Sequence, residues 1–150
     1  MRDALFSAEN FHRWAQRSLM DRNTLAREFR ADQVSPFFRA NGTNNPNTEE
    51  YKDWWRNGFA DWRLTIDGMV ARPLNLSLAQ LHQMPAREQI TRHDCVEGWS
   101  AIGKWRGAPL APILKAAGLS TRARYLVFHC ADFMGADRPY YESIDLFDAF

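Results

Sequence analysis

The feature that most constrains this chain is a predicted strand that runs into a tight turn and places a cysteine where the two meet. The stretch from Thr91 to Ser100 reads TRHDCVEGWS, and its Gly, Trp and Ser follow the predicted strand as turn residues. Positive charge from Arg92 or His93 favours the thiolate of Cys95, and a thiolate is the form of cysteine that binds a soft metal. The stretch therefore predicts a ligand or metal site at Cys95.

Size and composition limit the classes of protein to consider. The chain has 150 residues with 19 Lys and Arg against 18 Asp and Glu, which indicates one domain without a basic surface for nucleic acid. The two cysteines, Cys95 and Cys130, are too few for a disulfide scaffold. No stretch approaches the ~20 apolar residues of a membrane span, and the first residues lack a secretory signal, so we expect a soluble chain.

The sequence pattern of the N-terminal part predicts a segment that is separate from that domain. Apolar residues from Phe11 to Leu19 recur at helical spacing, which is typical of an amphipathic helix. A second short helix is expected from Asn23 to about Phe29. We therefore expect residues 1–35 to form a helical arm and residues 36–150 to form the main domain.

The sequence of the main domain predicts strands and helices that alternate irregularly. Strands are expected over 62–66, 89–96 and 125–130, with a two-residue hairpin turn at Asp67-Gly68. Helices are expected after Thr48, from the capping box at Ser77 to Pro85, and over 109–117 up to Gly118. Residues 143–150 resemble the start of another helix with no cap at its end. The pattern predicts an α+β fold.

Two motifs carry a resemblance to a known family. The segment CVEGWS at 95–100, followed by WRGAPL at 105–110, is similar to the core motif of the sulfite oxidase family of molybdenum enzymes. The likeness runs from about Pro36 to Leu146, far more than one short pattern match. It implies a molybdopterin-binding fold with a mixed, largely antiparallel sheet, peripheral helices and a C-terminal part that is missing here. CVEGWS looks closer to the bacterial branch that reduces oxidised methionine than to the Cys-x-Gly-Asn pattern of classical sulfite oxidases.

The resemblance assigns roles to individual residues. Cys95 matches the thiolate ligand of molybdenum, whose other sulfur ligands come from the pterin, and Tyr140 matches an active-site tyrosine that assists the chemistry. Arg39 and Asn41 lie in a segment similar to an early pterin-contacting one, although their spacing differs from that of animal and plant members. Arg92 is in register with an arginine of the bacterial branch, but strand alternation points positions 92 and 95 to opposite faces. We predict cofactor contacts by Arg39, Asn41, Arg92, His93 and Cys95.

The function implied is two-electron oxygen-atom transfer on a sulfur-containing or similar small substrate, either sulfite oxidation or sulfoxide reduction. The family's usual electron partner is a haem protein, often membrane-bound, and its bacterial members are commonly exported to the periplasm by a twin-arginine signal. No such signal is visible in this sequence. By the family resemblance we expect a periplasmic location, with the signal already removed, and a cytoplasmic location otherwise.

Several other functions stay open from the sequence. The fold could serve as a non-catalytic or cofactor-free binding module. His93, Cys95, His129 and Cys130 could form a zinc site, although adjacent residues diverge on a strand and zinc ligands usually come in pairs from tight turns. A thiol redox role for the two cysteines lacks a Cys-x-x-Cys motif. The many tryptophans fit core packing better than a nucleic-acid platform, because no basic excess accompanies them.

Overall fold

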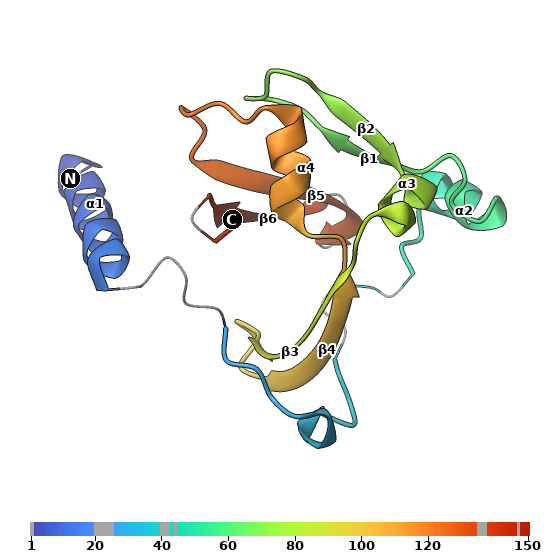
Figure 1. Ribbon diagram of the computed structural model, residues 1–150, viewed down its shortest axis with the longest axis horizontal. Helices are drawn as coiled ribbons and strands as arrows, with labels where there is room; N and C mark the ends of the chain where they lie inside the picture. Colours follow the sequence, from blue (N-terminus) through green and yellow to red (C-terminus); the bar gives the residue numbers. More distant parts are fainter. Residues whose placement is uncertain (1, 20–25, 40–42, 44, 135–137, 147) are drawn as a thin grey trace.

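A computed structural model describes residues 2–19, 26–39, 43, 45–134, 138–146 and 148–150 (Figure 1). Its described strands form three two-stranded antiparallel sheets, and Figure 1 shows one of them, β3–β4, as a long curved hairpin. The strands are β1 (Arg63–Ile66), β2 (Leu74–Ser77), β3 (Arg87–Asp94), β4 (Ser100–Gly107), β5 (Tyr125–Met134) and β6 (Arg138–Asp145). The helices are α1 (Arg2–Leu19), the 3₁₀ turn η1 (Ala31–Gln33), α2 (Glu49–Arg56), α3 (Leu78–Gln83) and α4 (Leu110–Ala117). The predicted α+β class and its antiparallel pairing are confirmed.

Local signals in the sequence determine where the helices of the main domain begin and end. Thr48 caps α2, its hydroxyl accepting a hydrogen bond from the Tyr51 N–H at 3.1 Å. Ser77 and Gln80 form the expected capping box at the start of α3, with bonds of 3.2 and 2.8 Å. Gly118 ends α4 at a φ of 69°, a left-handed conformation that glycine adopts without a steric penalty.

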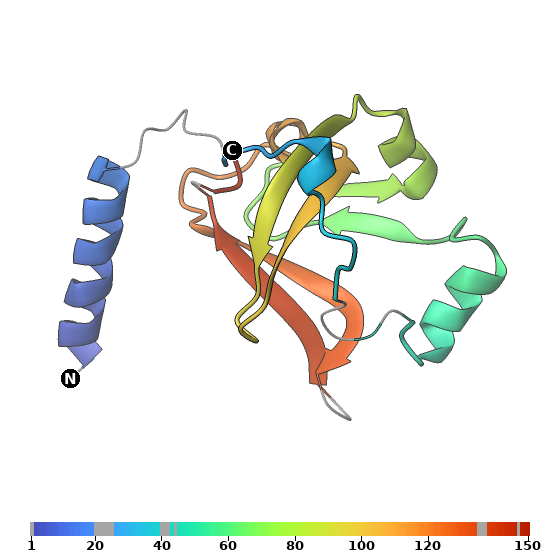
Figure 2. The same cartoon turned by 90° about the horizontal axis from the view of Figure 1, so that it is seen from below.

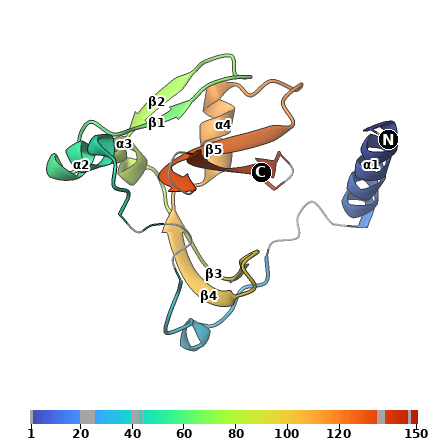
Figure 3. The same cartoon turned by 180° about the vertical axis from the view of Figure 1, so that it is seen from behind.

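The small core of the domain lies around α4, which Figures 1 and 3 show near β1–β2 and β5–β6. Ile113, Leu114 and Ala117 are buried, and Leu114 retains only 1% of its exposure. Full burial of one such leucine stabilises the fold by about 2 kcal/mol. A backbone bridge between Val70 and Leu119 fixes the chain before β2 against the end of α4.

That bridge explains why the predicted hairpin at Asp67-Gly68 is wrong. Gly68 does turn the chain with a φ of 81°, but β1 pairs with Leu74–Ser77 rather than with the residues directly after the turn. Val70 is already paired with Leu119, so residues 67–73 form a longer connection. An Asp-Gly dipeptide reports a local turn and carries no information about which residues pair beyond it.

Two predicted helices are also absent from the described residues. The stretch from Ser143 is the end of β6, where Ile144 lies opposite Leu126 of β5. Of the expected helix over 23–29, residues 26–29 are not helical and Glu28 makes a bridge to Thr91, while residues 23–25 lie outside the described residues. In both places a pairing partner distant in sequence overrides the local preference.

Residues 26–39 run along both outer edges of the β3–β4 hairpin (Figure 2). The Phe29 N–H donates to the Ile90 carbonyl at 2.9 Å on the β3 side. On the β4 side, Ser35 donates its N–H to the Ile102 carbonyl and accepts from the Ile102 N–H, both at 2.9 Å. These bonds satisfy backbone groups that a free hairpin edge would leave unpaired.

The N-terminal helix α1 is amphipathic as predicted, and Figures 1 and 2 show it apart from the sheets. Phe11, Trp14 and Leu19 are exposed. Among the described helices, none combines the length and the apolar composition needed to cross a membrane. The predicted domain boundary at residue 35 stays a prediction.

Candidate active site

Cys95 occupies the first position of the turn that joins β3 to β4. Its N–H donates to the Trp99 carbonyl at 2.9 Å and its carbonyl accepts from the Gly98 N–H at 3.0 Å, which closes a three-residue loop over 96–98. Gly98 has a φ of 85°, the left-handed conformation that such loops need at this position. The thiol is free and half-buried, so the turn presents it at the tip of the hairpin with one side accessible.

Strand alternation separates the two faces of this hairpin. Thr91, His93 and Cys95 lie on the inner face, where Thr91 is buried and the other two are half-buried. Arg92 and Asp94 lie on the outer face and are exposed. The structure therefore brings His93 to the same face as Cys95 and places Arg92 on the opposite one.

A cluster of four rings covers the inner face beside Cys95, and we call Phe38, His93, Trp99 and Trp105 the aromatic cluster. Phe38 meets Trp99 at 5.6 Å and Trp105 at 5.2 Å between ring centroids, both nearly edge to face. His93 lies 5.6 Å from Phe38 and 5.5 Å from Trp99. Such contacts add about 1 kcal/mol each to the burial of the rings, so the cluster rigidifies the base of the Cys95 turn.

On the outer face, a polar network joins the two strands one rung before the turn. Arg92 donates to the Asp94 carboxylate at 2.7 Å and to the Ser100 hydroxyl at 3.1 Å, and that hydroxyl donates to Asp94. The Ser100 hydrogen bond, followed by the Arg92 one, holds the pKa of Asp94 below its ordinary value. The charge of Arg92 is therefore engaged by Asp94 in this structure.

Tyr140 lies on β6 opposite an irregularity in β5. Three residues of β5, Cys130 to Asp132, stand between the paired positions His129 and Phe133, where β6 has only Tyr140. Bulges of this kind redirect side chains and are frequent beside active sites. The Tyr140 ring is half-buried, whereas Tyr141 points away and is 63% exposed. Of the two adjacent tyrosines, Tyr140 is the one turned inward.

The electrostatic surroundings of Tyr140 place it in the same region as Cys95. Its hydroxyl donates to the Glu142 carboxylate, and this bond is the main cause that raises the pKa of Tyr140 to about 12. Desolvation, the charge of Glu142 and the charges of Cys130 and Cys95 add to the shift. The phenol is therefore held in its neutral form, and its hydroxyl proton is directed at Glu142 in this structure.

The second cysteine has a different environment. Cys130 lies in the β5 bulge, and burial raises its pKa, to which the charges of Asp132 and Glu142 add. Asp132 itself accepts a hydrogen bond from the Thr43 hydroxyl. These conditions favour the thiol over the thiolate, so Cys130 is a poor metal ligand beside Cys95.

The remaining predicted site residues are Arg39 and Asn41, and for Arg39, the one that the structure describes, it gives no contact with Cys95. Arg39 is exposed and directly follows Phe38 of the aromatic cluster. Asn41 lies outside the described residues. Glu142 had no predicted role. Its spacing of two from Tyr140 on a strand places both side chains on one face and could have indicated the contact.

The donor set around Cys95 fits a metal that brings most of its own ligands. Within the described parts of the chain, no three His, Cys, Asp or Glu side chains gather closely enough to hold a metal ion. Cys95 offers one soft sulfur ligand from a half-buried side chain, which suits a molybdenum already bound by the sulfurs of a pterin. A zinc site needs about four protein ligands and gains no support from this arrangement.

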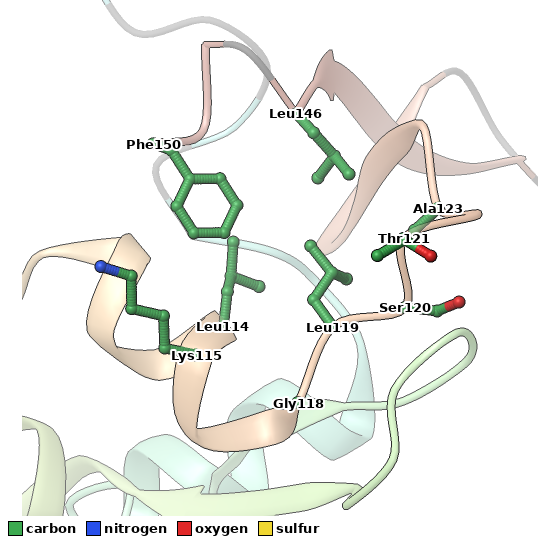
Figure 4. Close-up of a pocket in the computed structure, with 9 residues that line it drawn as sticks. All are labelled: Leu114, Lys115, Gly118, Leu119, Ser120, Thr121, Ala123, Leu146 and Phe150. Atoms are coloured by element: carbon green, nitrogen blue, oxygen red, sulfur yellow. The ribbon is translucent and has the colours of Figure 1, made fainter.

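A cavity of about 390 Å³ lies elsewhere, between the end of α4 and the last residues of the chain (Figure 4). Leu114, Leu119, Leu146 and Phe150 give it apolar walls, and Lys115 lies at its side. None of its lining residues belongs to the Cys95 turn or to the surroundings of Tyr140.

Comparison with known proteins identifies the family. Residues 52–150, which include Cys95, Trp99, Trp105 and Tyr140, match the model of the oxidoreductase molybdopterin binding domain. The chain belongs to this family. The resemblance to molybdenum enzymes of the sulfite oxidase type is thereby confirmed.

Relatives place the chain in the bacterial branch. It is 36% identical over 143 residues, 95% of its length, to YedZ1 of Azospira oryzae, which is provisionally named a protein-methionine-sulfoxide reductase subunit. It is 43% identical over 45% of its length to the protein-methionine-sulfoxide reductase catalytic subunit MsrP of Gluconobacter oxydans, and 40% identical over 47% to MsrP of Xanthomonas campestris. The chain spans 50% of the length of YedZ1 and 22% of each MsrP.

Proposed function

We propose that this domain binds a molybdenum cofactor through Cys95 and acts in the reduction of methionine sulfoxide in proteins. The observation that carries the proposal is the position of Cys95, a half-buried free thiol at the tip of a hairpin. The aromatic cluster lies on the same face of the hairpin, and the charge of Cys95 contributes to the raised pKa of Tyr140. The names of the relatives favour sulfoxide reduction over sulfite oxidation as the direction.

When bound, the cofactor supplies a redox centre that exchanges two electrons. The chain supplies the rest. Cys95 would hold the metal from the protein side, and the aromatic cluster, to which His93 and Trp99 on the two sides of the turn belong, keeps the turn in place. Tyr140, neutral at physiological pH, would donate its one hydroxyl proton toward the oxygen of the substrate, where negative charge develops, by turning away from Glu142, which accepts that proton in this structure.

The other predicted cofactor contacts differ in what they require of the structure. His93 already shares the inner face with Cys95, and Arg39 follows Phe38 where it packs against that face. Arg92 would have to leave both Asp94 and Ser100 to reach the same group. Pterin and phosphate recognition needs paired donors and acceptors, which these side chains and Asn41 would provide together.

Reduction of a sulfoxide to a thioether and water consumes two protons and two electrons. We propose that the electrons come from a separate electron-transfer protein, with a haem protein as the expected class, and that the reaction takes place in the periplasm. Both statements rest on the family resemblance.

The first test is metal retention. Protein purified from a host that makes the cofactor is compared with Cys95→Ser and Cys130→Ser, and molybdenum per chain is measured by mass spectrometry. We expect wild type and Cys130→Ser to carry equal molybdenum and Cys95→Ser to lose it by about tenfold or more, because the serine oxygen is a harder ligand. Full molybdenum occupancy in Cys95→Ser would refute the role of Cys95.

The second test concerns the substrate. Reduction of methionine sulfoxide in an oxidised peptide, driven by a reduced viologen dye, is compared with oxidation of sulfite by ferricyanide. We expect turnover of the peptide and little of sulfite. The reverse preference in molybdenum-loaded protein would overturn the proposed direction while leaving the cofactor assignment intact.

A further inference from the structure

The N-terminal helix α1 has an apolar face that is open to solvent. Phe11 is 63% exposed, Trp14 65% and Leu19 86%, and Ala15 is half-buried. Phe11, Trp14 and Ser18 follow one another at spacings of three and four residues, so they lie along one side of the helix. Figures 1, 2 and 3 agree in showing α1 apart from the sheets. This face is therefore available to a partner outside the main domain.

The side chains of this face contact one another. The ring centroids of Phe11 and Trp14 lie 6.0 Å apart, and the Ser18 hydroxyl donates to the Trp14 carbonyl at 2.7 Å. The hydroxyl thus keeps a hydrogen bond where water is absent, so burial of the face costs little at Ser18. The indole of Trp14 combines an apolar body with one N–H donor, which favours the boundary between hydrocarbon and water.

The sequence of α1 carries positive charge where these apolar residues gather. The segment from Asn10 to Leu19 contains Arg13 and Arg17 and no Asp or Glu, whereas the whole chain has 19 Lys and Arg against 18 Asp and Glu. Arginines combined with Phe and Trp on an apolar face are typical of helices that lie in the plane of a membrane. A second copy of α1 would bring like charges together, and helix-pairing seams are built from Leu, Ile and Val.

We propose that α1 binds the surface of a bilayer that contains anionic phospholipid and lies in its plane. Phe11 and Trp14 enter the layer between headgroups and acyl chains, to a depth of about 5–10 Å for helices of this kind. Arg13 and Arg17 add attraction to the negative surface. The main domain is then held beside the membrane. This inference depends on α1 alone, so it and the proposed function can fail independently.

The test is flotation of the whole chain with vesicles of phosphatidylcholine that contain one quarter phosphatidylglycerol, compared with vesicles of phosphatidylcholine alone. Each basic residue near an anionic surface strengthens binding about fivefold, so we expect the anionic vesicles to bind the chain tighter by about tenfold or more. Binding should weaken as salt rises from about 0.1 to about 1 M, because the Debye length then shortens from about 10 to about 3 Å.

A first variant removes the apolar contact. The double substitution Phe11→Ser and Trp14→Ser should lower the partition coefficient by about tenfold or more on anionic vesicles, because the rings no longer enter the bilayer. The matched control is Trp55→Ser, which removes from α2 a tryptophan with the same 65% exposure as Trp14. The control should bind as wild type does.

A second variant removes the charge. The double substitution Arg13→Gln and Arg17→Gln should lower binding to anionic vesicles by about tenfold or more and leave the weaker binding to neutral vesicles unchanged. Its matched control is Arg122→Gln with Arg124→Gln, which removes the same charge from two exposed residues of the main domain. This control should again bind as wild type does.

Several outcomes would overturn the proposal. One is a wild-type chain that does not float with anionic vesicles, and another is a Phe11→Ser and Trp14→Ser variant that floats as wild type does. Sedimentation without lipid would assign the face to a second copy if it found a dimer that this variant loses. Urea unfolding followed by tryptophan fluorescence would assign the face to the main domain if the variant were less stable. We expect a monomer and an unchanged urea midpoint.

Discussion

Substitution of Gly103 by alanine should destabilise the domain through the aromatic cluster. Gly103 is buried on the inner face of β4, opposite Thr91. A methyl group there would lie 2.8 Å from two ring atoms of Trp105 and 3.0 Å from Phe38. These distances are shorter than atoms in contact tolerate, so one or both rings must move and the edge-to-face contact between them is disturbed.

The magnitude follows from two opposing effects. Overpacking of a tight site costs about 1–3 kcal/mol. The backbone of Gly103 is outside the left-handed region, so alanine also restricts the unfolded chain and recovers about 0.5–1 kcal/mol. The midpoints of these two ranges leave a net loss of about 1 kcal/mol in the free energy of unfolding, or a Tm lower by roughly 2–4 °C for a chain of this size.

Urea unfolding followed by tryptophan fluorescence measures this difference, and Gly107→Ala is the matched control. Gly107 ends the same strand, and a methyl group there would meet nothing within 4 Å. It should change stability by less than about 0.5 kcal/mol. If Gly103→Ala proves as stable as Gly107→Ala, the rings are not packed against Gly103 and the account of the cluster is wrong.

Three further predictions address the turn, a helix start and an ion pair. Gly98→Ala should cost about 1 kcal/mol, because residue 98 has a φ of 85° and the strain is conformational rather than steric; thermal unfolding detects it, and an unchanged Tm would contradict the turn geometry. Thr48→Ala should cost about 1 kcal/mol by leaving the Tyr51 N–H without its cap, whereas Thr48→Ser should retain most of the stability in the same assay. Asp94 has a lowered pKa in the folded state, so its contribution is present above the unfolded value near 3.9 and is lost as pH falls through the folded one. The urea midpoint should therefore decrease from pH 7 to pH 3 by less in Asp94→Asn than in wild type. An equal decrease in both proteins would show that the carboxylate is not stabilised by folding.

Helix ends were predictable from the sequence because the groups that form them are neighbours. Ser77 with Gln80, and Gly118 after α4, act within one turn of backbone, and the structure has the helix boundaries near where these residues indicate. Strand pairing was not predictable in the same way. Ile144 lies in β6 because Leu126 is opposite, a relation that no local window contains.

The same distinction between local signals and tertiary contacts applies to the residues of the candidate site. Cys95 and Tyr140 were identified by motif, and their roles stay predictions. The packing of Phe38 on His93, and the contact of Glu142 with Tyr140, depend on tertiary structure or on the exact strand limits. A prediction that had recognised β6 as a strand would have placed Glu142 and Tyr140 on one face.

The two faces of the hairpin have different physical tasks, and the outer one supports the inner one. Asp94 and Ser100 form the rung next to the Cys95–Trp99 closure, so the Arg92–Asp94–Ser100 network holds the strands together immediately before the turn. The network is exposed and polar, so it contributes geometry rather than much stability. On the other face the rings pack on one another while Phe38 and Trp105 remain partly exposed, and the half-buried thiol follows His93 of that cluster by two residues. Because successive side chains of a strand point to opposite faces, one short stretch can form the exposed polar network on one face and present Cys95 to a ligand on the other.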